Sequence, residues 1–364
     1  MAKYGPSRGA KDSNGVPMTP EEKAIEIIEK KLGRTKSLNL RIDKTVPQGV
    51  VVSKRICNEN CIFDKKLGVA CHDDNSYRGS GNAISNNEII AIVEKLHSAT
   101  SVDINVHIAG DGEPTLFETE LLDLISRMRK IGYIKNIKLT TNGTRLSGGN
   151  PNLASRLKDA GLNEVNVSMH SLDRTEFKRI TGIDAQEAVM KGVISAIGSG
   201  LKTSVNVLIR DETFAELDDY IALSDNLGIR IKFFHIIDQS GQNQEHFDQL
   251  LKEFEKRLDA RASSAYSYIQ PYYGKIFIIG NAIIDLKDSL TNNCPVVNCK
   301  ARSACLEGCR YYARLSPTGI LQPCGARTDN LIDLKNDAVS HEQIYKSLLG
   351  GGKILYENLA AVIE

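Results

Sequence analysis

Cysteines are the residues of this chain whose type and spacing are most suggestive of chemistry. The eight cysteines fall into two groups that are separated by more than two hundred residues. Thiolates bind zinc and iron–sulfur clusters, and in a reducing compartment such groups favour metal or cluster binding over disulfides. We therefore expect two sites. Their candidate ligands are Cys57, Cys61 and Cys71 for the first, and Cys294, Cys299, Cys305, Cys309 and Cys324 for the second.

The composition is that of a globular protein. The chain has 364 residues, of which 41% are hydrophobic and 25% charged, and its net charge is +1. This charge gives no reason to expect nucleic acid or an anionic membrane as a partner. No apolar run approaches the roughly 18 residues that a spanning helix needs. We expect a cytoplasmic protein with one large α/β domain or two ordinary domains.

Strand and helix patterns alternate along the middle of the chain. Apolar, β-branched runs predict six strands, which cover residues 48–56, 101–110, 134–143, 162–171, 201–211 and 229–238. Helical spacing is typical of residues 117–132, 150–161, 185–200, 214–228 and 245–260. An amphipathic helix over 19–33 is expected to cover the bottom or side of the domain. Such alternation predicts a parallel sheet, either open and doubly wound or closed as a full or partial barrel.

Small and polar residues collect where the predicted strands end. Cys57 and Cys61 follow the first strand, residues 110–114 (GDGEP) the second, residues 140–143 (TTNG) the third and residues 168–171 (SMHS) the fourth. Because the carboxyl ends of parallel strands meet at one rim, we expect these residues to form the site there.

The order and wording of these blocks resemble the radical S-adenosylmethionine (SAM) superfamily. The resemblance covers roughly residues 40–330 and is nearest to the cyclase of molybdenum cofactor biosynthesis and its relatives. It implies an α/β fold with a partial (β/α)6 TIM-like barrel and a C-terminal cysteine-rich twitch/SPASM-like region. The implied divisions are 1–37 for a tail and helix, 38–240 for the barrel, 241–290 for a connecting helix and strands, and 291–364 for an auxiliary cluster region.

The resemblance also implies the cofactors. Two 4Fe-4S clusters and SAM are expected, with an electron donor such as flavodoxin or ferredoxin. In the family, three cysteines leave one iron open to chelate SAM. The reduced cluster then cleaves SAM to a 5′-deoxyadenosyl radical, which takes a hydrogen atom from a substrate. The protein orients the cofactor and excludes water.

The spacing of the first cysteine group departs from the family pattern. The common motif has two residues between its second and third cysteines, with an aromatic residue before the third; Phe63 is in place, but Asp64 stands where the third cysteine is expected. Ten extended residues span up to roughly 33 Å, so a longer loop can deliver Cys71 to the cluster. We expect Cys71 as the third ligand, with Asp64 as the alternative. The inserted loop carries Lys65 and Lys66, and we hypothesise that it reaches toward the cofactor edge or the substrate.

Other residues match the SAM contacts of the family. They are Phe63, Gly112, Glu113, Pro114, Thr141, Asn142, Ser168, Asn206 and Ile237. In the Gly-Glu-Pro stretch, backbone carbonyls or the carboxylate can accept from SAM's amino group. Hydroxyls and amides at strand ends could instead cap the next helix. Ser204 stands where the cyclase has a lysine near the cofactor, which leaves one contact in doubt.

The second cysteine group resembles the auxiliary cluster site of the cyclase. Residues 313–324 resemble a hairpin whose turn is at 316–319. Cys305, Cys309 and Cys324 match the three ligands of the cyclase cluster, and Cys294 or Cys299 could complete it. Zinc is the alternative occupant, because sites made of four cysteines commonly hold zinc.

The residues that could contact a substrate are less specific. The candidates are His170, Arg210, His235, Arg310 and Arg314. A lone histidine at a strand end is more often structural, whereas an arginine can bind a carboxylate or phosphate bidentately. Arg314 matches an arginine of the cyclase, but Tyr312 replaces another and the C-terminal Gly-Gly is missing.

We therefore expect a radical SAM enzyme, an oxidoreductase or lyase, that acts on a small molecule, nucleotide or peptide. A peptide-modifying enzyme shares the same two-cluster plan. A non-catalytic iron–sulfur or zinc protein on a barrel scaffold is the alternative of another class.

Overall fold

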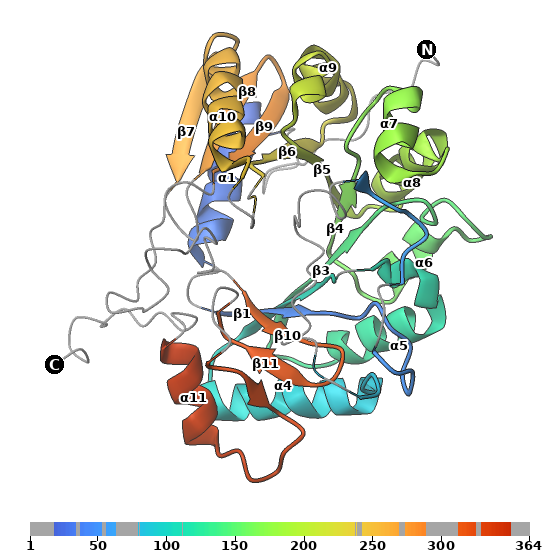
Figure 1. Ribbon diagram of the computed structural model, residues 1–364, viewed down its shortest axis with the longest axis vertical. Coiled ribbons are helices and arrows are strands. Elements are labelled where there is room, and N and C mark those ends of the chain that lie inside the picture. Colours follow the sequence, from blue (N-terminus) through green and yellow to red (C-terminus); the bar gives the residue numbers. More distant parts are fainter. Residues whose placement is uncertain are drawn as a thin grey trace, which may run out of the picture.

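The computed structural model describes residues 18–33, 37–52, 56–62, 79, 81–110, 112–236, 238, 242–268, 274–288, 312–324 and 329–350. Twelve strands form one sheet in the order β12-β11-β10-β1-β2-β3-β4-β5-β6-β9-β8-β7. The sheet curves around an open interior (Figure 1). The central strands are β1 (Leu38–Ile42), β2 (Ile104–Ile108), β3 (Ile134–Thr141), β4 (Glu164–Ser168), β5 (Lys202–Leu208) and β6 (Arg230–Phe234).

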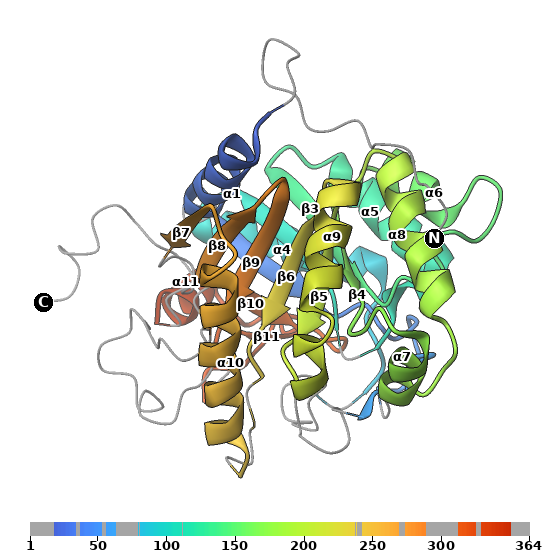
Figure 2. The ribbon, with the colours of Figure 1, turned by 90° about the horizontal axis from the view of Figure 1, so that it is seen from above.

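The six central strands are neighbours in chain order, and all pair in parallel. The helices between them lie on the outer side of the sheet (Figures 1 and 2). They are α4 (Asn86–Thr100), α5 (Glu118–Arg129), α6 (Leu153–Asp159), α7 (Arg174–Thr181), α8 (Gln186–Gly198) and α9 (Leu217–Leu227). This arrangement is the partial (β/α)6 barrel that the strand and helix pattern indicates.

Both ends of the barrel sheet are extended by later strands. After α10 (Gln244–Asp259), β9 (Ala282–Lys287) joins β6 in parallel, and β8 (Gly274–Ile279) and β7 (Ser264–Tyr268) continue antiparallel. At the other end, β10 (Ala313–Leu315) joins β1 in parallel. The strands β11 (Ile320–Gln322) and β12 (Ile332–Asp333) then follow antiparallel, and α11 (His341–Gly350) packs on α4.

Alternation along the strands separates two faces of the sheet. In β2, Ile104, Val106 and Ile108 are buried in the main hydrophobic core with residues of the outer helices. Because successive side chains of a strand point to opposite faces, Asn105 and His107 face the interior. The other central strands follow the same rule, so the interior face is unusually polar.

Local signals place the ends of the outer helices. Ser85 begins α4 with a capping box, in which its side chain accepts from the Glu88 amide and Glu88 accepts from the Ser85 amide. Asp173 caps α7 through the amide of Glu176. Gly182 ends α7 at φ +76°, a left-handed conformation that favours glycine.

The prediction of a first strand over 48–56 is wrong. The strand next to β2 is β1, and Val51 makes only an isolated bridge to Asn82. β1 buries Leu38, Leu40 and Ile42 in the core, whereas Val50 and Val51 are 42% and 59% exposed. Burial of alternate side chains decided the pairing, and a β-branched run alone did not.

The helix predicted over 19–33 is α1 (Pro20–Gly33), and it covers the edge extension of the sheet. Its Ala24 and Ile27 pack with Ile276, Ile278 and Ile283 of β8 and β9. The predicted hairpin is also present: β10 and β11 are antiparallel, and Gly319 lies in the turn at φ +89°.

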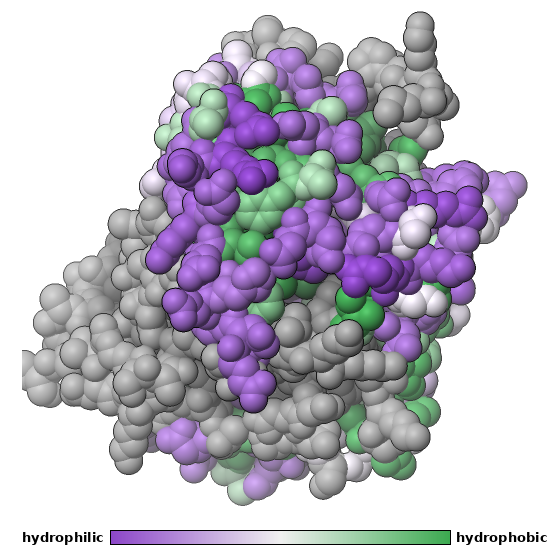
Figure 3. Space-filling model, turned by 45° about the horizontal axis from the view of Figure 1, so that its top comes forward, coloured by the Kyte–Doolittle hydropathy of each residue, from purple (hydrophilic) through white to green (hydrophobic). Residues whose placement is uncertain are grey.

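Hydrophilic side chains cover much of the described surface in Figure 3, with hydrophobic side chains gathered in smaller patches. None of the described helices is both long and apolar enough to cross a bilayer.

Candidate cofactor and substrate site

The stretch that leads into Cys57 lies directly against the Gly-Glu-Pro stretch after β2. The Glu113 amide donates to the Ile56 carbonyl at 2.9 Å. A Cβ on Gly112 would lie 2.2 Å from the same carbonyl oxygen, so a larger residue would displace this backbone. The structure therefore brings together two of the blocks that the sequence analysis singled out.

The Glu113 carboxylate points into the protein and organises the rim. It accepts from the Thr115 amide and hydroxyl, from the Thr141 hydroxyl at 2.6 Å and from the Asn142 amide at 2.7 Å. Burial raises the pKa of Glu113, while these hydrogen bonds oppose that rise. Because the carboxylate is occupied by four donors, the backbone carbonyls of the stretch are the better acceptors for an ammonium group.

Asn142 ties the end of β3 to the segment of residues 56–62, which we call the cysteine loop. Its side-chain amide donates to Asn58 Oδ1 at 2.7 Å, and its own Oδ1 accepts from the Thr144 amide at 3.2 Å and hydroxyl at 2.8 Å. Asn58 in turn donates to the Thr144 hydroxyl at 2.9 Å. Asn142 and Thr141 thus both have structural bonds at this rim.

Within the cysteine loop, Cys57 is partly exposed, Cys61 is buried, and neither forms a disulfide. The Glu59 amide donates to Cys57 Sγ at 3.4 Å, and Cys61 Sγ lies 3.6 Å from Glu59 Oε2. Two thiols at a rim of a barrel suit a cluster that needs thiolate ligands. Several predicted residues of this region lie outside the described residues. They are Phe63, Asp64, Lys65, Lys66 and Cys71.

Ser168 and Asn206 are neighbours in register at the carboxyl ends of β4 and β5. Both face the interior, since Val167 and Val205 on either side of them lie in the outer core. Asn206 Oδ1 is buried and has no hydrogen-bond partner in the described part of the chain. An unsatisfied buried amide oxygen calls for a donor, and a ligand with hydroxyl or amino groups such as SAM would supply one. These residues therefore fit the cofactor, while Ile237 lies outside the described residues.

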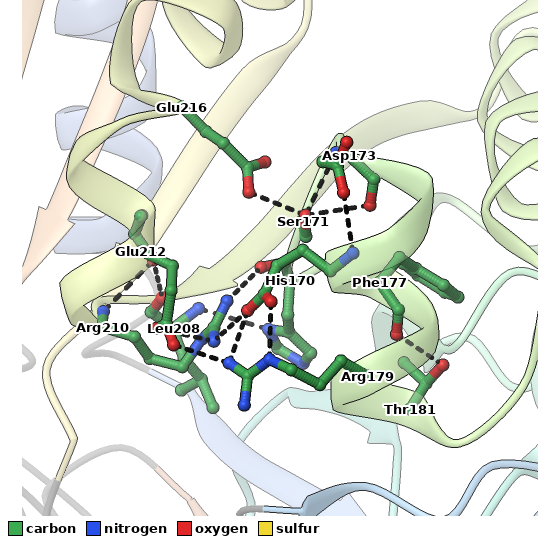
Figure 4. Close-up of polar contacts among 12 residues, drawn as sticks. His170, Ser171, Asp173, Phe177, Arg179, Thr181, Leu208, Arg210, Glu212 and Glu216 are labelled. Atoms are coloured by element: carbon green, nitrogen blue, oxygen red, sulfur yellow. Dashed lines mark hydrogen bonds and ion pairs between the residues drawn. The ribbon is translucent and has the colours of Figure 1, made fainter.

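His170 and Arg210 lie just past the ends of β4 and β5 and are bonded to each other (Figure 4). His170 Nδ1 accepts from the Leu208 amide at 3.2 Å. Burial, and secondly the Arg210 charge, lower the pKa of His170 to about 3, so the imidazole is neutral. Arg210 donates to the His170 carbonyl at 3.0 Å, to Glu176 at 2.9 Å and to Glu212 at 3.0 Å. The structure thus places both substrate candidates in an internal network.

His235 is buried after β6. Its Nε2 lies 3.2 Å from Asp248 Oδ1 of α10. Burial lowers the pKa of His235, and Asp248 opposes that shift. This candidate connects β6 to α10 at the rim.

The interior face holds a buried lysine that the sequence analysis missed. Lys232 of β6 is 6% exposed, and its ammonium donates to Asn166 Oδ1 at 2.7 Å. The same oxygen accepts from the Ser204 hydroxyl at 2.7 Å. No carboxylate of the described residues lies within ion-pair distance of Lys232. A lysine between two core residues, Ile231 and Phe233, is the signal that could have identified it.

Further charged residues surround Lys232 on the interior face. Burial, followed by the charges of Arg230, Lys138 and Lys287, lowers the pKa of Lys232 well below its usual value. On β9, Asp285 is fully buried and accepts from Lys287 at 2.5 Å, with Arg230 at 3.4 Å.

The opposite wall of the interior contains the last described candidates. Arg314 of β10 stands in register with Arg41 of β1. Tyr312 accepts from Lys138 Nζ at 2.8 Å, and its ring lies 5.1 Å from that of His107. Cys324 is buried just after β11. The remaining residues of the second cysteine group and Arg310 lie outside the described residues. They are Cys294, Cys299, Cys305, Cys309 and Arg310.

Comparisons with known proteins agree with this geometry. A family model described as the radical SAM superfamily matches residues 51–223. A protein of Sulfurisphaera tokodaii named "Probable GTP 3',8-cyclase" is 31% identical over 302 residues, which are 81% of this chain and 86% of that protein. A Saccharolobus islandicus protein of the same name is 30% identical and covers 81% of this chain and 88% of its own.

Solved structures show the likeness of the fold. SuiB of Streptococcus suis bound to S-adenosylmethionine has a TM-score of 0.56 at 14% identity, covering 93% of this chain and 74% of its own. The enzyme anSMEcpe with bound AdoMet has a TM-score of 0.54 at 15% identity, covering 87% and 82%. This chain is therefore an enzyme of the radical SAM superfamily, related to proteins named as GTP 3′,8-cyclases.

Proposed function

We propose that this enzyme reductively cleaves SAM at a 4Fe-4S cluster and takes a hydrogen atom from an anionic substrate, with a nucleotide as the first candidate. When bound, the cluster and SAM would supply an electron and a 5′-deoxyadenosyl radical. Cys57, Cys61 and Cys71 would hold the cluster. An electron donor such as flavodoxin or ferredoxin would reduce it.

The SAM site would lie along the ends of β2 to β6. Backbone carbonyls of Gly112 and its neighbours would accept from the amino group, because the Glu113 carboxylate already has four donors. Ser168 and the unsatisfied Asn206 Oδ1 would bond to the polar groups of the cofactor from β4 and β5. Asn142 would act through its bond to Asn58 by fixing the cysteine loop.

The single observation that supports an anionic substrate is Lys232. A buried ammonium bonded to one amide oxygen, in the interior face of the barrel, is costly unless an anion approaches it. Phosphate or carboxylate oxygens would restore its ordinary protonation. The names of the relatives, which refer to GTP, make a nucleoside triphosphate the first candidate.

We further propose that the second cysteine group binds an auxiliary 4Fe-4S cluster near the substrate. Its residues are Cys294, Cys299, Cys305, Cys309 and Cys324. Cys324 supports this role, because it lies buried at the end of β11, on the hairpin that extends the barrel beside β1. Arg314, on the same hairpin, would bind substrate oxygens from that side.

The proposal is tested by anaerobic reconstitution of the enzyme with iron and sulfide, reduction with dithionite and addition of SAM. We expect GTP to increase the yield of 5′-deoxyadenosine, and Lys232→Met to remove that increase. An equal yield with GTP, with a peptide mixture and without any substrate would argue against a nucleotide. Stimulation by the peptides alone would favour a peptide-modifying enzyme.

A further inference from the structure

Helix α7 connects the ends of β4 and β5 to the cysteine loop. At its C-terminal end, the Thr181 carbonyl accepts from the Asn60 amide at 2.7 Å. Ile180 is fully buried and packs with Cys61, beside Leu208 of β5. A Cβ on Gly182 would lie 3.3 Å from Asn60 Cβ, so the helix end and the loop approach closely. The position of Cys61 therefore depends on the position of α7.

An ion pair holds the same helix nearer its start. Glu176 accepts from Arg210 Nη1 at 2.9 Å, and its two oxygens accept from Arg179 at 2.6 and 2.7 Å. The Arg179 hydrogen bonds lower the pKa of Glu176 most, with help from those of Arg210, and bring it to about 2, so it stays charged. The Arg210 side chain is only 9% exposed, whereas that of Arg179 is 49% exposed. The buried partner is therefore the one that fixes the helix.

Arg210 is itself held by two other elements. Its Nη2 donates to the His170 carbonyl, and Nη1 also lies 3.0 Å from Glu212 of the 3-10 helix Asp211–Phe214 (η3). Figure 4 shows Arg210 between His170 and Glu212. One guanidinium thus joins the loop after β4, the turn after β5 and helix α7, the kind of multiple bonding that a planar fork permits.

The two contacts lie on one face of α7. Glu176 and Ile180 are four residues apart, so both project from the same side of the helix. Their separation along the axis is about 6 Å. A rotation of the helix that loosens Glu176 would move Ile180 away from Cys61.

We propose that Arg210 is a positioning residue for the cysteine loop. Through Glu176 it fixes α7, and the end of α7 fixes Asn60 and Cys61. The role goes beyond the proposed function, because it concerns the readiness of the loop before any cofactor binds. It also explains why a strand-end arginine of the barrel faces other protein groups.

The test is amide hydrogen exchange in the apoprotein, followed by mass spectrometry of peptides that cover residues 56–62. We expect Glu176→Gln and Arg210→Lys to increase exchange there at least about tenfold, because a hydrogen bond to a charged group is lost. Arg174→Gln is the matched control: it removes the exposed pair with Asp184 from the same helix. It should leave residues 56–62 at the wild-type rate.

A general loss of stability would raise exchange equally in peptides of α5 and α8, and that result would overturn the proposal. An unchanged rate at 56–62 in both variants would also overturn it. If Glu176→Gln does not fold, Arg210→Lys decides, because it keeps the charge and loses only the fork. As a second readout, the reconstituted variants should show a weaker change in the cluster's electron paramagnetic resonance signal on addition of SAM.

Discussion

Glu113 accepts a hydrogen bond of 2.7 Å from the backbone amide of Asn142, and through it the turn after β2 is joined to the end of β3. The same carboxylate takes the Thr141 hydroxyl at 2.6 Å. The backbone of Glu113 is bonded to Ile56, one residue before Cys57. One buried acidic residue therefore sets the relation between two strand ends and the cysteine loop.

Replacing Glu113 with Gln should lower the free energy of unfolding by about 2 kcal/mol, because the amide nitrogen cannot accept from these donors. Urea unfolding of the apoprotein measures this loss. Glu118→Gln, which removes a partly exposed pair with Arg156, is the comparison and should cost less. Equal losses in the two variants would contradict the role given to Glu113.

His170 should make the stability of the fold depend on pH. Its pKa is lowered to about 3 in the folded protein and is about 6.5 when unfolded. Above pH 6.5 both states bind no proton here, and its contribution is fully present. As the pH falls toward 3 only the unfolded state takes up the proton, so stability falls by up to about 1.4 kcal/mol per pH unit.

Urea unfolding between pH 7 and pH 4 measures this slope. His170→Asn keeps an acceptor for the Leu208 amide but does not titrate, so its slope should be smaller by that amount. An identical slope in the two proteins would mean that His170 is protonated in the fold or that other groups dominate.

Lys232→Met should separate stability from ligand binding. Removing a buried charge that lacks a carboxylate partner is expected to leave the melting temperature unchanged or to raise it. Asn166 Oδ1 keeps its bond from Ser204 in this variant. Affinity for GTP should fall at least about tenfold, as expected for a lost hydrogen bond between charged groups.

Calorimetric titration of GTP into the wild type, Lys232→Met and Lys232→Arg measures the effect. The arginine variant keeps a cation and should retain part of the affinity. A methionine variant that melts lower and binds GTP as tightly as the wild type would rule out this role.

The third cluster ligand can be identified from iron content. Cys71→Ala should lose the first cluster, because a thiolate suits cluster iron better than a carboxylate. Asp64→Ala should retain it. Iron and sulfide analysis of both variants, in a background that lacks the five C-terminal cysteines, gives the answer. The opposite pattern would make Asp64 the ligand.

The sequence was most informative where one period governs a whole element. β2 to β6 and their helices follow from alternation and helical spacing, because each buries one face in the outer core. β1 was misplaced, since Val50 to Val52 resemble a strand more than Leu38 to Ile42 does. Only the pairing with β2 and β10 distinguishes the two.

Side-chain partners could be predicted less well than strand ends. The position of Glu113 at the rim was predicted, but its inward carboxylate depends on Thr141 and Asn142, which lie almost thirty residues away. Arg210 was likewise placed at a strand end, and its bond to Glu176 follows from how α7 packs. Cys71 as third ligand and an auxiliary cluster stay predictions.

The central claim is tested most directly by the fate of a substrate hydrogen. The reduced, reconstituted enzyme is given SAM and deuterated GTP, and 5′-deoxyadenosine is analysed by mass spectrometry. We predict deuterium in the 5′-deoxyadenosine of the wild type and no 5′-deoxyadenosine from Cys57→Ala. A wild-type enzyme with a full cluster that cleaves SAM without gaining deuterium, or does not cleave it at all, would contradict the proposed reaction.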